Sequence, residues 1–278
     1  MIGAMTQREI TQQADLLDSR GRLASPGWAR DLVLSYDRRA IRASPLRIKE
    51  WDYYCILTDE FGAAFTIADN SYMGMVSASI LDFTQPWEIT TSVITPFPMG
   101  KFHMPPSSAE GDVHFHNNRV NMAFALDRRR RRISVDFASF TGGKSLSGEI
   151  SMVMPQPLDT MVIATPFAED PLAFYYNQKI NCMPAEGRCI YGGRDYIFSP
   201  AASFGVLDWG RGRRLFSRTQ KLALTERDGG CAMCALPPEM TKVHHIDWWQ
   251  RDEGRTDLRN GILLCETCHH RVHDNGWE

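Results

Sequence analysis

The sequence predicts an α+β protein in two parts, a mainly antiparallel β domain at residues 1–212 and a small zinc-stapled module at residues 213–278. Two observations predict this division. Between residues 46 and 208, short runs of alternating apolar and polar residues are separated by clusters of Pro, Gly, Ser and Asn, a pattern typical of a β-barrel or sandwich. Near the end of the chain, two Cys-x-x-Cys pairs stand thirty residues apart, as in zinc-stabilised folds.

Composition sets the broad class. The chain has 278 residues, of which 43% are hydrophobic and 23% charged, so it can bury a sizeable core as a soluble globular protein. No run approaches the roughly 18 apolar residues of a membrane span, and the first residues lack the apolar region of a signal peptide. We therefore expect a cytoplasmic protein with reduced cysteines and no membrane partner. The net charge of −2 gives no global attraction to DNA, so a nucleic-acid-binding role would need local basic groups.

The first domain is expected to begin with a helix at residues 6–17 and to continue in strands, one of them at residues 150–154. Its three cysteines, Cys55, Cys182 and Cys189, have no ligand spacing. We expect them to be buried thiols of the core.

A β-hairpin is predicted in the middle of this domain. Residues 120–126 and 133–137 both alternate between apolar and polar or small side chains. Between them lie Asp127 and five consecutive arginines, residues 128–132. We interpret the arginines as a solvated, self-repelling hairpin tip, with a grip on nucleic acid as the alternative.

Two pairs of polar residues in the first domain are interpreted as structural. Glu50 and Asp52 could form a carboxylate pair for acid–base chemistry, but no partner base accompanies them. His114 and His116 are two residues apart and would share one face of a strand. This spacing favours an exposed strand face over a metal site.

A helix is expected at the start of the second part. Ser217 and Gln220 have the spacing of a capping box, in which the first side chain caps the helix and the second reaches back to it. The helix would run to about Arg227 and end at residues 228–230, where an aspartate precedes two glycines. This helix delivers the chain to Cys231.

Four cysteines are predicted to bind one structural zinc ion: Cys231, Cys234, Cys265 and Cys268. Each Cys-x-x-Cys pair can present two thiolates from a tight turn, and two such pairs complete a closed tetrahedral site. The metal would stabilise a segment that is too short to bury a useful core alone. A redox pair or a disulfide is the alternative, but two pairs at this spacing favour the metal.

Histidines near the second pair predict a separate metal site. If residues 266–274 are helical, His269 and His273 are four positions apart and share one face of the helix. Cys268 is turned about 100° away from His269. One short helix can therefore give a thiolate to the structural zinc and two imidazoles to a second ion.

His244 and His245 are expected in an extended segment at residues 242–248. Neighbouring side chains of a strand point to opposite faces. One histidine can then bind the second metal ion while the other reaches toward a substrate.

The order of these residues resembles the HNH (ββα-metal) endonuclease family. His-His-Ile at residues 244–246 is followed by Asn260, fifteen residues after the second histidine, and by His-x-x-x-His at residues 269–273. The flanking residues 254–265 and 274–277 are also similar to zinc-bearing members of that family. Ligands, spacing and flanks agree together over about residues 215–278.

The resemblance implies a metal-dependent DNA hydrolase. His245 would be the general base, and Asn260 would brace the loop that holds its ring. His244, His269 and His273 would hold one catalytic divalent ion, which could be Mg²⁺, Mn²⁺, Ni²⁺ or Zn²⁺. The products would carry a 5′ phosphate and a 3′ hydroxyl.

Local basic groups of the module are candidates for contact with DNA phosphates. Residues 211–278 contain 11 basic and 10 acidic residues, so the module has little excess charge. Arg271 lies within the predicted metal-binding helix, and Arg214 and Arg218 lie at the start of the module. We expect these three arginines to contact DNA, whereas solvated side chains are the alternative.

Residues 47–54, 66–69 and 207–212 resemble an uncharacterised bacterial domain-of-unknown-function family (number 2804) with lipocalin-like β-barrels. The resemblance spans most of residues 5–212. It implies a pocket for a small apolar ligand and names no chemistry.

Two functions of different classes follow from the sequence. The first is a metal-dependent HNH endonuclease that hydrolyses DNA phosphodiester bonds. The alternative is a non-catalytic β-barrel ligand-binding protein with a structural zinc-finger-like appendage, and a weaker third reading makes the barrel an enzyme for an apolar substrate. Both leading functions predict a structural zinc ion, whereas a second, exchangeable divalent ion would favour the nuclease.

Overall fold

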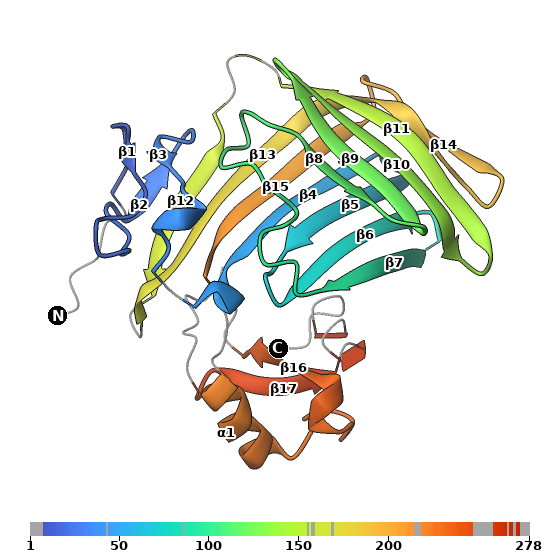
Figure 1. Cartoon of the computed structure of the whole chain (residues 1–278). Helices are drawn as coiled ribbons and strands as arrows, with labels where there is room; N and C mark the ends of the chain where they lie inside the picture. The colour runs from blue at the N-terminus through green and yellow to red at the C-terminus, as the bar shows by residue number, and fades with distance from the viewer. Residues whose placement is uncertain are drawn as a thin grey trace. The chain divides into compact units, whose positions relative to one another are not determined.

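The computed structural model describes residues 8–42, 44–85, 87–154, 156, 159–167, 170–213, 218–246, 258–265, 267–268 and 271–272. The chain divides into two compact units, Met1–Arg214 and Leu215–Glu278. The first unit is built mainly of antiparallel strands that form a curled half-barrel, so the predicted fold class is confirmed (Figure 1). No helix in the described ranges is long and apolar enough to cross a membrane.

Strands and two short 3₁₀ helices make up the first unit. In chain order they are β1 (Ala14–Asp15), β2 (Gly27–Ala29), β3 (Leu34–Ser35), η1 (Arg38–Ala40), η2 (Pro45–Arg47), β4 (Lys49–Leu57), β5 (Phe61–Asp69), β6 (Met73–Asp82), β7 (Trp87–Pro96), β8 (Val113–His116), β9 (Val120–Asp127), β10 (Arg130–Thr141), β11 (Lys144–Val153), β12 (Met161–Phe167), β13 (Asp170–Tyr191), β14 (Arg194–Phe198) and β15 (Phe204–Arg213).

The main sheet has the order β7-β6-β5-β4-β15-β13-β11-β10-β9-β8, and all of these neighbours pair antiparallel. Strands β4–β7 pair in chain order, and so do β8–β11, whereas β11 pairs with β13, and β15 lies between β4 and β13. This position of β15 joins the beginning and the end of the first unit in one sheet (Figure 1).

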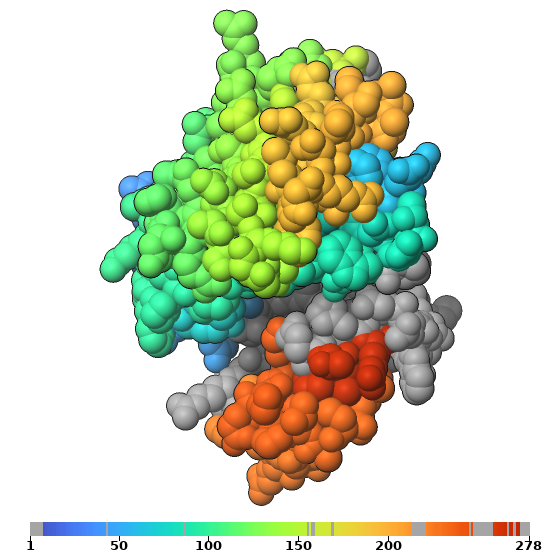
Figure 2. All heavy atoms as spheres, turned by 90° about the vertical axis from the view of Figure 1, so that its right-hand side faces the viewer, coloured from blue at the N-terminus to red at the C-terminus, as the bar shows by residue number. Residues whose placement is uncertain are grey.

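The long strand β13 makes the sheet curl. Its first half pairs with β12 and β15, and its second half pairs with β11 and β14. The residues of β10–β11 and of β13–β14 cover adjoining parts of one face of the unit (Figure 2). Phe61 of β5 makes edge contacts with Tyr196 and Phe198 of β14 at 5.3 Å between ring centroids. The opposite walls of the half-barrel therefore meet through aromatic side chains.

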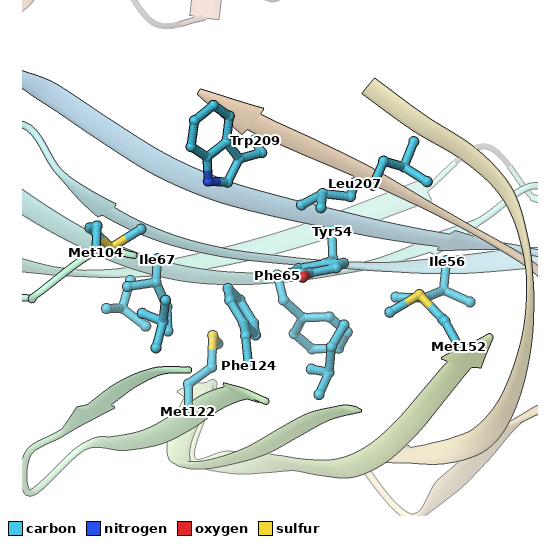
Figure 3. Packing of buried hydrophobic residues seen from close by; sticks show 14 of the residues in the cluster. Tyr54, Ile56, Phe65, Ile67, Met104, Met122, Phe124, Met152, Leu207 and Trp209 are labelled. Atoms are coloured by element: carbon cyan, nitrogen blue, oxygen red, sulfur yellow. The ribbon is translucent and has the colours of Figure 1, made fainter. Parts of the chain in front are cut away.

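The core lies on the concave side of this sheet because the side chains alternate along each strand. In β4, Tyr54 and Ile56 are buried while Leu57 is exposed. Phe65 of β5 and Phe124 of β9 pack in the same interior cluster (Figure 3). The hydrophobic pattern of the sequence thus reports which face of each strand is covered.

The predicted helix at residues 6–17 is wrong in the described part of that segment. Residues 14 and 15 form β1, which pairs with β3, and Leu17 forms a bridge with Leu23. The amide of Ile10 donates to the carbonyl of Trp28 at 2.7 Å. The backbone groups are thus bonded to distant segments, and this tertiary pairing outweighs the local helical pattern.

The predicted hairpin is confirmed as β9 and β10, but one of its arginines is buried. The strand begins at Arg130, so alternation already applies within the arginine run. Arg131 is only 4% exposed, and its guanidinium lies 3.4 Å from the Tyr54 hydroxyl. Only Arg128 and Arg129 form the turn between the strands, and they are exposed like Arg130 and Arg132.

The expectation of three buried thiols is correct for one residue. Cys189 is buried, and this burial raises the pKa of its thiol to about 12. Cys55 is half-buried, and Cys182 is exposed. Cys182 has a φ of 58° at an irregularity in the pairing of β13 with β15, and this irregularity breaks the strand alternation there.

Glu50 and Asp52 face the interior of the half-barrel, as their alternation with Tyr54 requires. The Tyr36 hydroxyl donates to Glu50 at 2.9 Å, and Arg38 forms an ion pair with the same carboxylate. Burial raises the pKa of both carboxyl groups, whereas nearby Arg211 lowers it. Their structural role was expected from the sequence, and the structure supplies the cations that accompany them.

Arg211 of β15 is completely buried and holds this part of the unit together. Its guanidinium donates to Asp52 at 2.9 Å and to the carbonyl of Pro105 at 2.8 and 3.1 Å. It also donates to the carbonyls of Trp51 and Gly210, each at 2.9 Å. One side chain therefore ties the sheet to the loop that contains Pro105.

Replacing Arg211 with methionine is expected to destabilise the first unit by about 3–5 kcal/mol, because Asp52 would stay buried without its hydrogen-bonded cation. Urea unfolding of the full chain, followed by tryptophan fluorescence, measures this loss. The double variant R211M/D52L should lose less than the sum of the two single variants, since the partners interact directly. A loss below about 1 kcal/mol for R211M would contradict the assigned role of the buried pair.

The second unit contains α1 (Arg218–Asp228), η3 (Pro238–Met240), β16 (Thr241–His245) and β17 (Gly261–Cys265). Strands β16 and β17 form an antiparallel pair, and α1 packs on β17. The helix was expected to end at about residue 227, and it ends at Asp228 as the glycines predict. Of its predicted capping box, Ser217 lies outside the described residues.

Candidate metal centre

The first cysteine pair lies on a tight turn directly after α1. Gly229, at a φ of 67°, lets the chain leave the helix in a left-handed conformation. The amide of Cys231 donates to the carbonyl of Leu236 at 2.8 Å, and the amide of Ala235 donates to the carbonyl of Cys231 at 2.8 Å. These bonds fold residues 231–236 back on themselves, so both thiols of the pair point to one place.

The second pair comes from the end of β17 and the segment that follows. Cys265 is the last residue of the strand, and Cys268 lies in the helical residues 267–268. The amide of Ala232 donates to the carbonyl of Leu263 at 2.9 Å, which joins the first turn to this strand. The strand pairing and this bond bring the two cysteine pairs together.

The four cysteine sulfur atoms fit a zinc ion. All of them lie within 4.8 Å of one another. The Sγ atoms of Cys234 and Cys265 are 3.6 Å apart, close to the roughly 3.8 Å edge of a tetrahedron with Zn–S bonds of about 2.3 Å. Three of these cysteines are buried and Cys234 is exposed. Among the described residues, this is the group of ligands that could hold a metal ion.

Backbone amides favour the thiolate form of Cys231. Burial raises the pKa of its thiol, but the N–H groups of Cys265, Met233 and Cys234 outweigh burial and lower the pKa to about 6. Burial and the neighbouring thiols raise the pKa of Cys268 to about 12. A divalent ion would bind the four cysteines as thiolates, and this binding would release protons.

The two adjacent histidines lie on the same β16–β17 pair, toward the end away from Cys265. His244 stands opposite Ile262, and His245 stands opposite Gly261. His244 is buried, with an exposed fraction of 7%. His245 is the last residue of β16, at the point where the strand pairing ends.

Asn260 directly precedes β17 and lies next to the histidine pair. Its side chain is buried, at 6% exposure. Its carbonyl accepts a hydrogen bond of 2.9 Å from the amide of Ile246, the residue after His245. The structure therefore brings the backbone of the predicted general base and the predicted bracing asparagine together, although fifteen residues separate them in sequence.

The remaining predicted site residues are placed only in part. The predicted helix is helical at residues 267–268 and 271–272, and Arg271 is exposed. Arg218 is the first residue of α1. His269, His273 and Arg214 lie outside the described residues.

Two further residues belong to the site by contact, and sequence reasoning gave neither a site role. Arg227 donates to the carbonyl of Leu258 at 2.8 Å and to the carbonyl of Gly261 at 2.6 Å. Asp228 was expected only to end the helix, yet its carboxylate accepts from Arg227 and from the amide of Leu263. The adjacency of Arg227 and Asp228 before the glycines was the available signal.

The histidines of the first unit do not form a metal site with other ligands in the described ranges. His114 and His116 stack at 6.4 Å between ring centroids and are both exposed, as expected. His114 forms a hydrogen bond of 2.7 Å with Asn121.

A hollow of about 420 Å³ lies on the first unit beside Trp51. The Trp51 ring stacks on Tyr175 at 5.7 Å, and its N–H donates to Asp208 at 3.2 Å. The hollow is lined by Trp51, Tyr53, Thr66, Ala68, Asn70, Met75 and Asp208.

Two family models match the chain. Residues 7–226 match the family described as Domain of unknown function (DUF2804), and residues 231–275 match HNH endonuclease. Both resemblances expected from the sequence are thereby confirmed. No curated protein matches the chain.

Two solved structures are similar to part of the chain. Kievitone hydratase from Nectria haematococca is 15% identical, with a TM-score of 0.38, over 60% of this chain and 48% of that structure. A protein of AttH type from Nitrosomonas europaea is 11% identical, with a TM-score of 0.42, over 66% of this chain and 57% of that structure. The chain thus spans about half the length of each.

Proposed function

Because the chain belongs to the DUF2804 family and also contains an HNH endonuclease domain, we propose that residues 213–278 hydrolyse phosphodiester bonds of DNA with a divalent ion. One observation supports this most. Four cysteines suffice for a closed zinc site. His244 and His245 on β16 and Asn260 before β17 lie at the other end of the same strand pair and are not needed for that site.

In the proposed reaction, His245 accepts a proton from a water molecule as the water oxygen forms a bond to phosphorus. The bond from phosphorus to the 3′ oxygen breaks, and the leaving oxygen is protonated by solvent. A neutral imidazole suits this task because histidine normally titrates near working pH. Asn260 keeps the end of β16 in place through the amide of Ile246.

A divalent ion bound here would supply positive charge for the phosphate and for the leaving 3′ oxygen. We propose His244, His269 and His273 as its ligands. Buried His244, on β16, gives this set one fixed ligand. Arg271, Arg214 and Arg218 are proposed to contact the DNA backbone, and Arg271 is exposed as this role requires.

The test is cleavage of supercoiled plasmid by the purified full chain with Mg²⁺, Mn²⁺ or Ni²⁺. We expect nicked and linear products with 5′ phosphate ends, and no cleavage in excess EDTA. If zinc-loaded protein leaves the plasmid intact with each of the three ions, the second unit is a structural appendage and not a nuclease. The β-barrel would then carry the function as a ligand-binding domain, and the apolar hollow beside Trp51 is where binding of a small apolar ligand would be sought by tryptophan fluorescence.

A further inference from the structure

Arg227 lies in the last turn of α1, and its guanidinium contacts the loop that contains Asn260 on both sides of that residue. One terminal nitrogen donates to the carbonyl of Leu258 at 2.8 Å, and the other donates to the carbonyl of Gly261 at 2.6 Å. These two carbonyls stand on either side of Asn260 in the chain. The guanidinium therefore fixes the backbone before and after the asparagine at the same time.

Asp228 orients this guanidinium. Its two carboxylate oxygens accept from the Nε and a terminal nitrogen of Arg227, at 2.5 and 3.0 Å. One of the same oxygens accepts from the amide of Leu263 at 3.0 Å. The Asp228 side chain is 10% exposed, whereas the Arg227 side chain is 45% exposed. The carboxylate thus joins the end of α1 to β17 and holds the guanidinium toward the loop.

We propose that Arg227 is a positioning residue of the nuclease site, acting through the Asn260 loop on His245. This inference rests on the proposed function. The contacts run without a gap from Arg227 to the carbonyls around Asn260, and from the carbonyl of Asn260 to the amide of Ile246 at 2.9 Å. Ile246 follows His245, so a shift of the loop shifts the end of the strand that carries the base.

Two simpler roles for Arg227 make different predictions. An exposed ion pair between sequence neighbours contributes little, about 0–1 kcal/mol, and would affect neither the loop nor the reaction. A contact with a DNA phosphate would depend on charge and would survive replacement by lysine. Positioning requires the planar fork, because a lysine ammonium cannot reach two separated carbonyls and the carboxylate in one geometry.

The test compares R227K with wild type in the plasmid assay. We expect the rate at saturating DNA to fall about 10- to 100-fold, with KM for DNA, its salt dependence and the zinc content unchanged. The double variant R227K/D228N should be no slower than the slower single variant, since both changes open the same contact. The control is L222A on the same helix, where Leu222 is 57% exposed.

A second readout does not depend on cleavage. The Ile246 amide donates to Asn260, so its hydrogen exchange should quicken in R227K and remain slow in L222A. If R227K cleaves at the wild-type rate and its Ile246 exchange is unchanged, the positioning role of Arg227 is wrong, while the proposed nuclease function stands. Wild-type protein that does not cleave would overturn the proposed nuclease, whereas faster Ile246 exchange in R227K would still uphold the contact of Arg227 with the loop.

Discussion

Replacing His245 with alanine is expected to slow plasmid cleavage by about 10²- to 10⁴-fold, the usual contribution of a positioned general base. His245 ends β16 opposite Gly261, next to the Ile246 amide that donates to the carbonyl of Asn260. Initial rates at saturating Mn²⁺ measure the effect.

The matched control is H114A, which removes an exposed histidine from β8. It should cleave at the wild-type rate. The zinc content of H245A should equal that of wild type, because four cysteines are enough to hold a zinc ion without His245. H245A that cleaves as fast as wild type would show that another group activates the water.

Replacing Cys265 with serine is expected to remove the structural zinc and to unfold the second unit. Zinc binding supplies about 10–16 kcal/mol in small zinc-stabilised modules, more than this unit can replace with its few buried apolar residues. Zinc content should fall well below one ion per chain. Limited proteolysis should then cut within residues 215–278 and spare the sheet of the first unit.

C182S is the matched control for this experiment. Cys182 is exposed and belongs to the first unit, so its loss should change neither zinc content nor proteolysis. C265S that still holds a full equivalent of zinc and resists proteolysis would exclude the four-cysteine site.

Much of the first unit could be predicted because a strand records its burial in its sequence. The alternation at residues 120–126 and 133–137 became β9 and β10 in register, with Val135 opposite Met122. The same alternation continues into the arginine run and places Arg131 inside, although the charge of the run favours solvent. The segment at residues 6–17 misled because its pairing partners lie elsewhere in the chain.

The residues of the candidate site could likewise be predicted only in part. Cysteine and histidine spacing could be read from the sequence because metal chemistry requires those side chains at those distances. Arg227 and Asp228 could not be assigned, since their partners are backbone carbonyls and an amide, which carry no residue identity. The role of Arg211 could not be predicted for the same reason, because four of the five hydrogen bonds described for it go to carbonyl groups of Pro105, Trp51 and Gly210.

The most direct test follows plasmid cleavage by the zinc-loaded full chain before and after Mn²⁺ is added. We predict no cleavage while only the four-cysteine site is filled, and cleavage once a second, exchangeable ion binds. Cleavage should stop again in EDTA at a concentration that removes the exchangeable ion and leaves the structural zinc in place. Absence of cleavage at saturating Mn²⁺, with zinc retained and the second unit folded, would contradict a nuclease function.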